Sequence, residues 1–325
     1  MLVEGCGDGL AVRSKRGMNL ELGDRSTGAV GEGMLELLDR RLLDDGAKLY
    51  SLIDGAKFSR LNRLVSPQDK SIELYSLLGE AAVADAVYAG PILILHKARE
   101  NCTLLAKLLD EYNSAGFISL IVSAENLADL VKRLVWLTEV RHEDGTEWVM
   151  RYYDPTILPH WLDVLDVEQR TSALSGTLQW LFKNVRGTNQ AVDFGIFGSA
   201  KILDSRPMLL SDGQCDDLMA LAMPYIVMSQ LSNDNPKVLD KIPKNERYDF
   251  FYRQIEVARG LKVISAVDIK TFCILAVMFG PEFSTHPSII KAAESSNADI
   301  SFSEKVMEWS AEQWELIEAD MLLLS

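Results

Sequence analysis

The sequence predicts an α/β N-terminal lobe, built on a mixed sheet with flanking helices, followed by an all-α C-terminal lobe. Three observations lead to this prediction. The chain of 325 residues is longer than one hydrophobic core usually organises. From Met34 onward, apolar residues alternate between helical and strand spacing. After Pro207 only helical spacing with capping signals remains.

In the first lobe, the spacing of apolar residues places each element in turn. Helices are expected at residues 34–45, at 102–112 and from a cap at Ser123, and buried strands at 49–53, 91–95 and 117–122. A hairpin follows, with strands 136–142 and 147–153 joined by an Asp-Gly turn. Two more strands, 178–183 and 193–202, are expected to close the lobe.

Capping residues mark the helices of the second lobe. Ser211 and Gln214 form a capping box ahead of a long helix that Pro224 should kink. Helices at 245–259 and from Ser265 to Gly280 follow, and a last one is expected to run from Ser301 past Met321. The predicted division is a leader at 1–32, an α/β domain at 33–207 and a helical lobe at 208–325.

Composition and charge narrow the class of protein. With 48% hydrophobic and 25% charged residues the chain is an ordinary globular one. The net charge of −14 makes nucleic acid an unexpected partner. Four scattered cysteines without CxxC spacing indicate reduced core residues of a cytosolic protein. The first 32 residues, rich in glycine, are expected to be a flexible leader. Neither an export signal nor a membrane-spanning run is apparent, so we expect a cytoplasmic protein.

Sequence patterns of familiar enzymes are missing from this chain. There is no G-x-S-x-G elbow, no phosphate-binding G-x-x-x-x-G-K-[ST] loop and no H-E-x-x-H pair. The four histidines are scattered, and none has a second ligand at helical spacing, so each is interpreted as a surface or core residue. No catalytic residue, metal or cofactor is assigned, although a triad that meets only in space stays open.

The strongest case for an enzyme uses Asp54 and Asp154. Each is expected at the C-terminal end of a strand, where open α/β sheets commonly place ligand-binding groups, and two carboxylates could hold Mg²⁺ for a metal-dependent hydrolase. The competing interpretation for Asp154 is structural: Asp154 caps a helix with Pro155 as its first residue, and the helix runs through Leu165.

Arg151 lies in the string WVMRYYDP, residues 148–155. On a strand, Val149, Arg151 and Tyr153 would share one face, and neither face is plainly solvated. A partly buried guanidinium needs a carboxylate or carbonyl partner. A pair with Asp154 or Asp54 would lock the hairpin to the sheet, which is favoured over a catalytic arginine.

Four stretches together resemble a known family: LYSLIDGA (49–56), AGPILI (89–94), GFISLIVSAENLADLVKRLVWLTEV (116–140) and MRYYDPTIL (150–158). In this order they are similar to the domain of unknown function 4123 family, over about residues 48–182. The helical stretch at 257–283 also resembles the tail that commonly follows that domain. Family members usually carry Trp where this chain has Ile92, a change of volume at a core position, and the leader has no counterpart in them.

The resemblance implies a non-enzymatic adaptor chaperone of bacterial type VI secretion. Such a protein binds a cognate toxic effector in the cytoplasm and loads it onto the VgrG spike. Arg151, Tyr153, Asp154 and Asp54 are then organising residues of the first lobe, with a role in effector binding left open. The C-terminal region 289–325, with eight acidic residues and two lysines, is either a solvated face or a surface for a basic partner through Glu308, Glu312 and Glu315. A purely structural subunit of the secretion apparatus is a further alternative.

Overall fold

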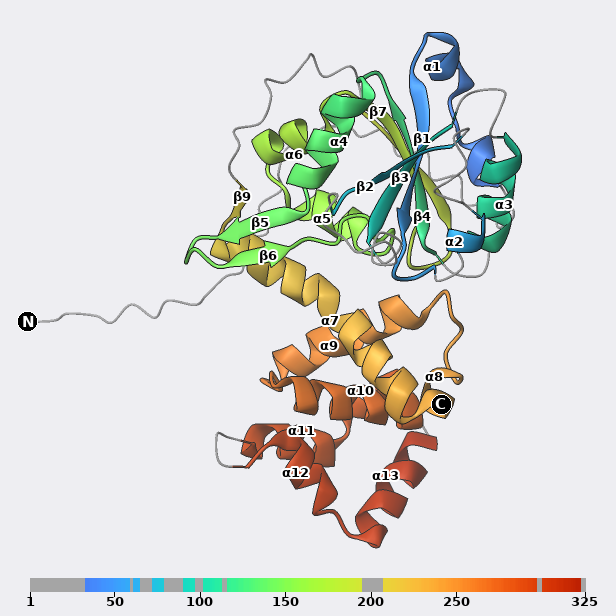
Figure 1. The fold of residues 1–325 in the computed structure, drawn as a ribbon. Coiled ribbons are helices and arrows are strands. Elements are labelled where there is room, and N and C mark those ends of the chain that lie inside the picture. Colours follow the sequence, from blue (N-terminus) through green and yellow to red (C-terminus); the bar gives the residue numbers. More distant parts are fainter. Residues whose placement is uncertain are drawn as a thin grey trace, which may run out of the picture.

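The computed structural model of the chain has two lobes, one containing β-sheets and one wholly helical, joined by the long helix α7 (Figure 1). The expected architecture is therefore confirmed. The structure describes residues 33–58, 61–64, 72–78, 90–96, 102–112, 116–194, 207–296 and 300–322. The predicted leader, residues 1–32, lies outside the described residues.

A six-stranded sheet forms the centre of the first lobe, with strand order β2-β3-β1-β4-β7-β8. Its strands are β1 (Lys48–Asp54), β2 (Glu73–Ser76), β3 (Pro91–His96), β4 (Ile118–Ser123), β7 (Thr177–Lys183) and β8 (Asn189–Asp193). Every pairing in this sheet is antiparallel. The central strands β1, β3 and β4 are almost wholly buried, as their continuous apolar runs predict.

Helices cover both faces of this sheet (Figure 1). Leu49, Ile53 and Leu120 lie in a core shared with α3, while Tyr50, Leu52 and Ile121 lie in a second core shared with α4, α5 and α6. Because successive side chains of a strand point to opposite faces of the sheet, each strand packs against helices on both faces. The helices of this lobe are α1 (Arg40–Asp44), α2 (Leu61–Leu64), α3 (Cys102–Tyr112), α4 (Leu127–Trp136), α5 (Leu158–Val164) and α6 (Val167–Leu174), preceded by the 3₁₀ turn η1 (Met34–Glu36).

A smaller three-stranded sheet carries the predicted hairpin. Strand β5 (Glu139–His142) pairs antiparallel with β6 (Glu147–Val149) and parallel with β9 (Met208–Leu210). Strand pairing in the lobe as a whole is therefore mixed. Because β9 belongs to this sheet, the purely helical part of the chain begins at Asp212.

Several predicted boundaries in the first lobe are wrong. The helix expected at 34–45 is interrupted, because Asp39 accepts a hydrogen bond from the amide of Arg41 and starts α1 afresh. Asn126 rather than Ser123 caps α4, and that helix continues to Trp136, where a strand was expected. Strand β6 ends at Val149, so the expected alternation of Arg151 and Tyr153 on one strand face does not occur. The strand expected at 193–202 is β8 at Asn189–Asp193, and residues 195–206 lie outside the described part of the chain.

The second lobe packs its helices around its own core, which includes Phe251, Phe272 and Phe283. Its elements are α7 (Asp212–Asp234), α8 (Pro236–Leu239), α9 (Arg247–Gly260), α10 (Ala266–Phe279), η3 (Pro281–Thr285), α11 (Pro287–Ser295), α12 (Phe302–Met307) and α13 (Ala311–Leu322). The capping box of Ser211 and Gln214 opens α7 as predicted, and Ser265 caps α10. Gly280, with φ of 94°, ends α10 in a backbone conformation that favours glycine.

The single helix expected from Ser301 past Met321 is wrong. The Ser301 and Glu304 box does start a helix, but α12 ends at Met307. Ser310 and Gln313 then exchange hydrogen bonds between side chains and amides, which starts α13 as a separate helix. In the described part of the chain, no helix combines the length and apolar character that crossing a membrane would need.

Candidate functional site

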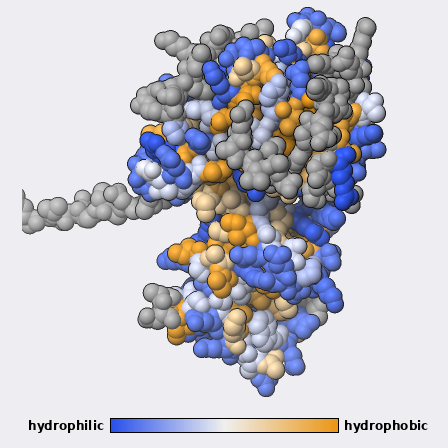
Figure 2. Space-filling model, in the orientation of Figure 1, coloured by the Kyte–Doolittle hydropathy of each residue, from blue (hydrophilic) through white to orange (hydrophobic). Residues whose placement is uncertain are grey.

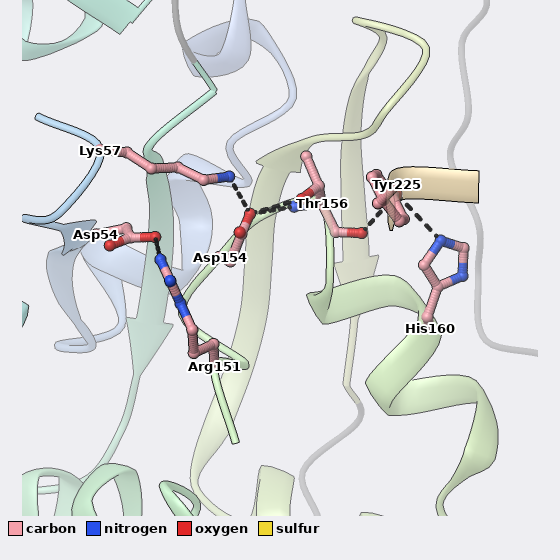
Figure 3. A network of polar contacts seen from close by, with 7 residues as sticks. All are labelled: Asp54, Lys57, Arg151, Asp154, Thr156, His160 and Tyr225. Atoms are coloured by element: carbon pink, nitrogen blue, oxygen red, sulfur yellow. Dashed lines mark hydrogen bonds and ion pairs between the residues drawn. The ribbon is translucent and has the colours of Figure 1, made fainter. Parts of the chain in front are cut away.

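Asp54 and Arg151 form an ion pair that joins the end of β1 to the turn after β6 (Figure 3). Nη2 of Arg151 donates to Oδ2 of Asp54 over 2.7 Å. The Asp54 side chain is fully buried, whereas that of Arg151 is 43% exposed. Burial lowers the pKa of the Arg151 guanidinium, but the hydrogen bond and charge of Asp54 outweigh this effect and raise the pKa overall. Of the two partners proposed for Arg151, the structure shows Asp54.

Asp154 is engaged by a different cation, Lys57, three residues beyond the end of β1. Oδ1 of Asp154 accepts from Nζ of Lys57 over 2.6 Å, from the amide of Thr156 over 3.0 Å and from the hydroxyl of Thr156 over 2.7 Å (Figure 3). Asp154 thus fixes a turn by binding the amide two residues ahead. The predicted helix cap is wrong, because α5 begins only at Leu158 and Ile157 occupies its cap position.

Tyr152 and Tyr153, between these charged residues, are both buried. The hydroxyl of Tyr152 donates to the carbonyl of Leu134 in α4 over 2.6 Å, and burial raises its pKa well above the ordinary range. The guanidinium carbon of Arg151 lies 5.8 Å from the centre of the Tyr153 ring. Residues 151–154 therefore tie β1, α4 and the start of α5 into one unit.

A second group of polar contacts joins the two lobes. Tyr225 of α7 donates to the carbonyl of Thr156 over 2.9 Å, and its hydroxyl lies 3.3 Å from Nε2 of His160 in α5 (Figure 3). Arg186, in the turn between β7 and β8, donates to both carboxylate oxygens of Asp249 in α9, each over 2.7 Å. The side chains of Arg186 and Asp249 are 52% and 39% exposed.

A cleft of about 430 Å³ lies beside these inter-lobe contacts. The first lobe contributes residues of α5 and of the β7–β8 turn to its lining, and the second contributes residues of α7 and α9. Aromatic rings are stacked along it: His160 and Tyr248 have ring centres 5.2 Å apart, and Tyr248 and Tyr252 have ring centres 6.1 Å apart. Burial and the charge of Arg186 lower the pKa of His160, so its ring is neutral at pH 7. Figure 2 shows hydrophobic residues at the surface in the narrow region where the lobes meet.

Residues 49–172 match the family described as "Domain of unknown function (DUF4123)". The match supports the family predicted from the sequence. Nothing among the curated proteins or the solved structures matches the chain. The DUF4123 segment runs from β1 into α6 and contains both ion pairs of Figure 3, whereas the helical stretch at 257–283 lies outside it.

Sequence reasoning did not single out the residues that line the inter-lobe cleft. The lining comes from separate stretches of the chain that share no local motif, and it includes His160, Arg186, Tyr248 and Tyr252. Sequence reasoning also missed Lys57 and the contact of Ser51 with His96, whose Oγ and Nε2 atoms are 2.7 Å apart. Ser51 is fully buried and His96 is 7% exposed, as the interpretation of His96 as a core residue allows.

The predicted acidic face lies on the surface of the helical lobe. Glu308 follows the end of α12, Glu312 and Glu315 lie on α13, and all three are exposed. A hydrogen bond from Ser310 lowers the pKa of Glu312, which keeps that side chain charged. Among the described residues, no three or more His, Cys, Asp or Glu side chains gather where they could hold a metal ion.

Proposed function

We propose that the protein is a non-enzymatic adaptor chaperone that binds a cognate type VI secretion effector and loads it onto the VgrG spike. The observation that carries the proposal is the cleft of about 430 Å³ between the lobes, next to the segment that matches the DUF4123 family. A cleft bordered by a sheet lobe and a helical lobe can hold an extended or helical segment of another polypeptide. Apolar and aromatic anchors with a charged rim are the groups that such binding uses.

The ion pairs of the first lobe fit this proposal as architecture. Asp54 and Asp154 are buried and each is held by its own cation, Arg151 and Lys57. No observation favours the alternative of a metal-dependent hydrolase that uses these two carboxylates. Arg151, Tyr153, Asp154 and Asp54 are proposed to shape the lobe that presents the cleft.

The acidic face of Glu308, Glu312 and Glu315 is proposed to orient a basic segment of the effector or of the spike. Charges at the rim of an interface mainly raise the association rate and the specificity. Replacing all three with lysine should slow effector binding, and the slowing should grow as the salt concentration falls. An unchanged association rate at low salt would remove this face from the proposal.

Co-expression with the toxin encoded beside the gene tests the adaptor function. We expect the toxin to co-purify with the full chain and to become more soluble, and the pair to be captured by VgrG in a second pull-down. Stoichiometric assembly with VgrG without any toxin would instead indicate a structural subunit. Turnover of a small substrate by the purified protein alone would contradict the proposal outright.

A further inference from the structure

We propose that the inter-lobe cleft is a binding site for a cationic side chain, lysine or arginine, of a bound polypeptide, with Asp163 and Tyr252 as the groups that contact it. The inference rests on the proposed adaptor function for the nature of its ligand, a polypeptide. It adds to that function the kind of side chain that the cleft recognises in the bound polypeptide.

One of the two carboxylates that line the cleft forms no ion pair with the cation of the lining. The lining contains two carboxylates, Asp163 and Asp249, and one guanidinium, Arg186. Both oxygens of Asp249 are held by Arg186, so these two charges neutralise each other. Asp163 is an exposed residue of α5 and has no hydrogen bond or ion pair to any residue in the described part of the chain. Among the described residues that line the cleft, carboxylates therefore outnumber cations by two to one.

The surroundings of Asp163 favour a cation next to it. The side chain is exposed enough to be reached, yet neighbouring atoms displace water and raise its pKa, an effect that the charge of Arg170 only partly opposes. Arg170 itself donates to the carbonyl of Leu162. A carboxylate that has lost part of its hydration gains from a cationic partner.

The aromatic wall adds a second attraction for the same kind of group. Tyr248 is fixed by its hydroxyl, which donates to the carbonyl of Leu221 over 3.1 Å, and it lies between His160 and Tyr252 in the stack. Tyr252 ends the stack and is 38% exposed, so its ring is open to a ligand. The face of an aromatic ring attracts ammonium and guanidinium groups within about 6 Å. A neutral His160 adds no positive charge that would repel them.

Short peptides test the site without any effector. The full chain, with its four histidines isotopically labelled and His160 assigned by comparison with His160→Gln, is titrated with acetylated Gly-Ser-X-Ser-Gly amides. X is arginine, lysine, citrulline or glutamate. We expect the arginine and lysine peptides to shift the His160 ring signals, and citrulline, which is arginine without its charge, to leave them unchanged. Equal shifts with arginine and citrulline, or none with any peptide, would overturn the inference.

Variants assign the contact to the two proposed residues. Asp163→Asn should weaken arginine-peptide binding about five-fold, and Tyr252→Leu by a similar factor. Asp217→Asn, which removes an exposed carboxylate of α7 outside the cleft, should have no effect. Unchanged binding in both cleft variants would sink the assignment.

Spermidine serves as a further arm, because a polyamine offers the same charged group without a peptide. Binding of spermidine that shifts the same signals and is tighter than that of the arginine peptide would assign the site to a small polyamine instead.

The adaptor function and the cationic site in the cleft can be refuted independently of each other. Peptide binding without effector co-purification would refute the adaptor, and effector co-purification unaffected by Asp163→Asn and Tyr252→Leu would refute the cleft as the contact.

Discussion

The ion pairs inside the first lobe and the ion pair between the lobes differ in how much protein surrounds them. Asp54 is fully buried and the Asp154 side chain is 7% exposed, whereas both members of the Arg186–Asp249 pair are more than one-third exposed. When its cation is removed, a buried carboxylate is not solvated by water, whereas an exposed carboxylate is. The ion pairs of Asp54 and Asp154 should therefore control the stability of the fold. The Arg186–Asp249 pair should instead control the orientation of the two lobes and the access of a ligand to the cleft.

Removing Arg151 should give the largest loss of stability. Arg151→Ala leaves the fully buried Asp54 carboxylate without a cation and should lower the free energy of unfolding by about 3 kcal/mol. Asp54→Asn should cost less, because the half-exposed guanidinium returns to water. Urea unfolding followed by circular dichroism measures both. Arg141→Ala is the matched control, since its pair with Glu147 is exposed on both sides and should cost about 1 kcal/mol or less. Equal losses in Arg151→Ala and Arg141→Ala would contradict the distinction between the two regions.

Acid should destabilise the first lobe through His96. Burial lowers the pKa of His96 from 6.5 to about 4, so the unfolded chain takes up a proton at a pH at which the folded chain does not. The stability that depends on a neutral His96 is present above pH 6.5 and is lost as the pH falls towards 4. Between pH 7 and pH 4.5 the loss should be about 2.5 kcal/mol. It is measured by urea unfolding at the two pH values, as the change in the wild-type protein that His96→Asn does not show.

His160 provides the comparison at the junction. Its pKa is lowered as well, but the ring is only partly buried, so His160→Gln should change the pH dependence less than His96→Asn does. A larger change in His160→Gln would mean that the junction, not the sheet, holds the acid-sensitive group.

Two tyrosine hydroxyls compare the regions at the level of single hydrogen bonds. Tyr152→Phe removes the donor to the buried carbonyl of Leu134 and should cost about 1.5 kcal/mol. Tyr225→Phe removes the donor to the carbonyl of Thr156 between the lobes and should cost about 0.5–1 kcal/mol, because water can reach this partly exposed site. Thermal unfolding measures both, and a larger cost for Tyr225→Phe would reverse the ranking.

The parts of this fold that could be predicted from the sequence depend on neighbouring residues. The capping boxes at Ser211 and Ser301 start helices as expected, because the residues that make each cap lie within three positions of each other. The break before Ser310 was missed because apolar spacing continues across it, although Ser310 and Gln313 repeat the same capping pattern. The apolar spacing that predicted one helix includes Met307, which is 78% exposed, so the spacing did not show which residues are buried across the break.

The sites depend on contacts that no local pattern contains. Lys57 meets Asp154 across 97 positions of the chain, and Arg186 meets Asp249 across 63. The sequence predicted that Arg151 needs a carboxylate, and it named Asp54 as one of two, because burial of a charge demands a partner. A cleft between the two lobes was expected, but the residues that line it were not predicted, because the turn after β7 and helix α9 come together only on folding.

The smallest effect expected is the coupling between Arg186 and Asp249. In a double-mutant cycle of Arg186→Ala and Asp249→Ala, the interaction free energy should be about 0.5–1 kcal/mol, because both side chains are solvated even though the pair makes two hydrogen bonds. Salt should reduce it, since exposed charges are screened. The same pair holds the turn after β7 against α9, so the variants should change the angular freedom of the lobes, seen by small-angle X-ray scattering, more than they change stability. A coupling as large as the loss in Arg151→Ala would show that the junction is as rigid a part of the molecule as the sheet, and would leave the cleft no freedom to open around a ligand.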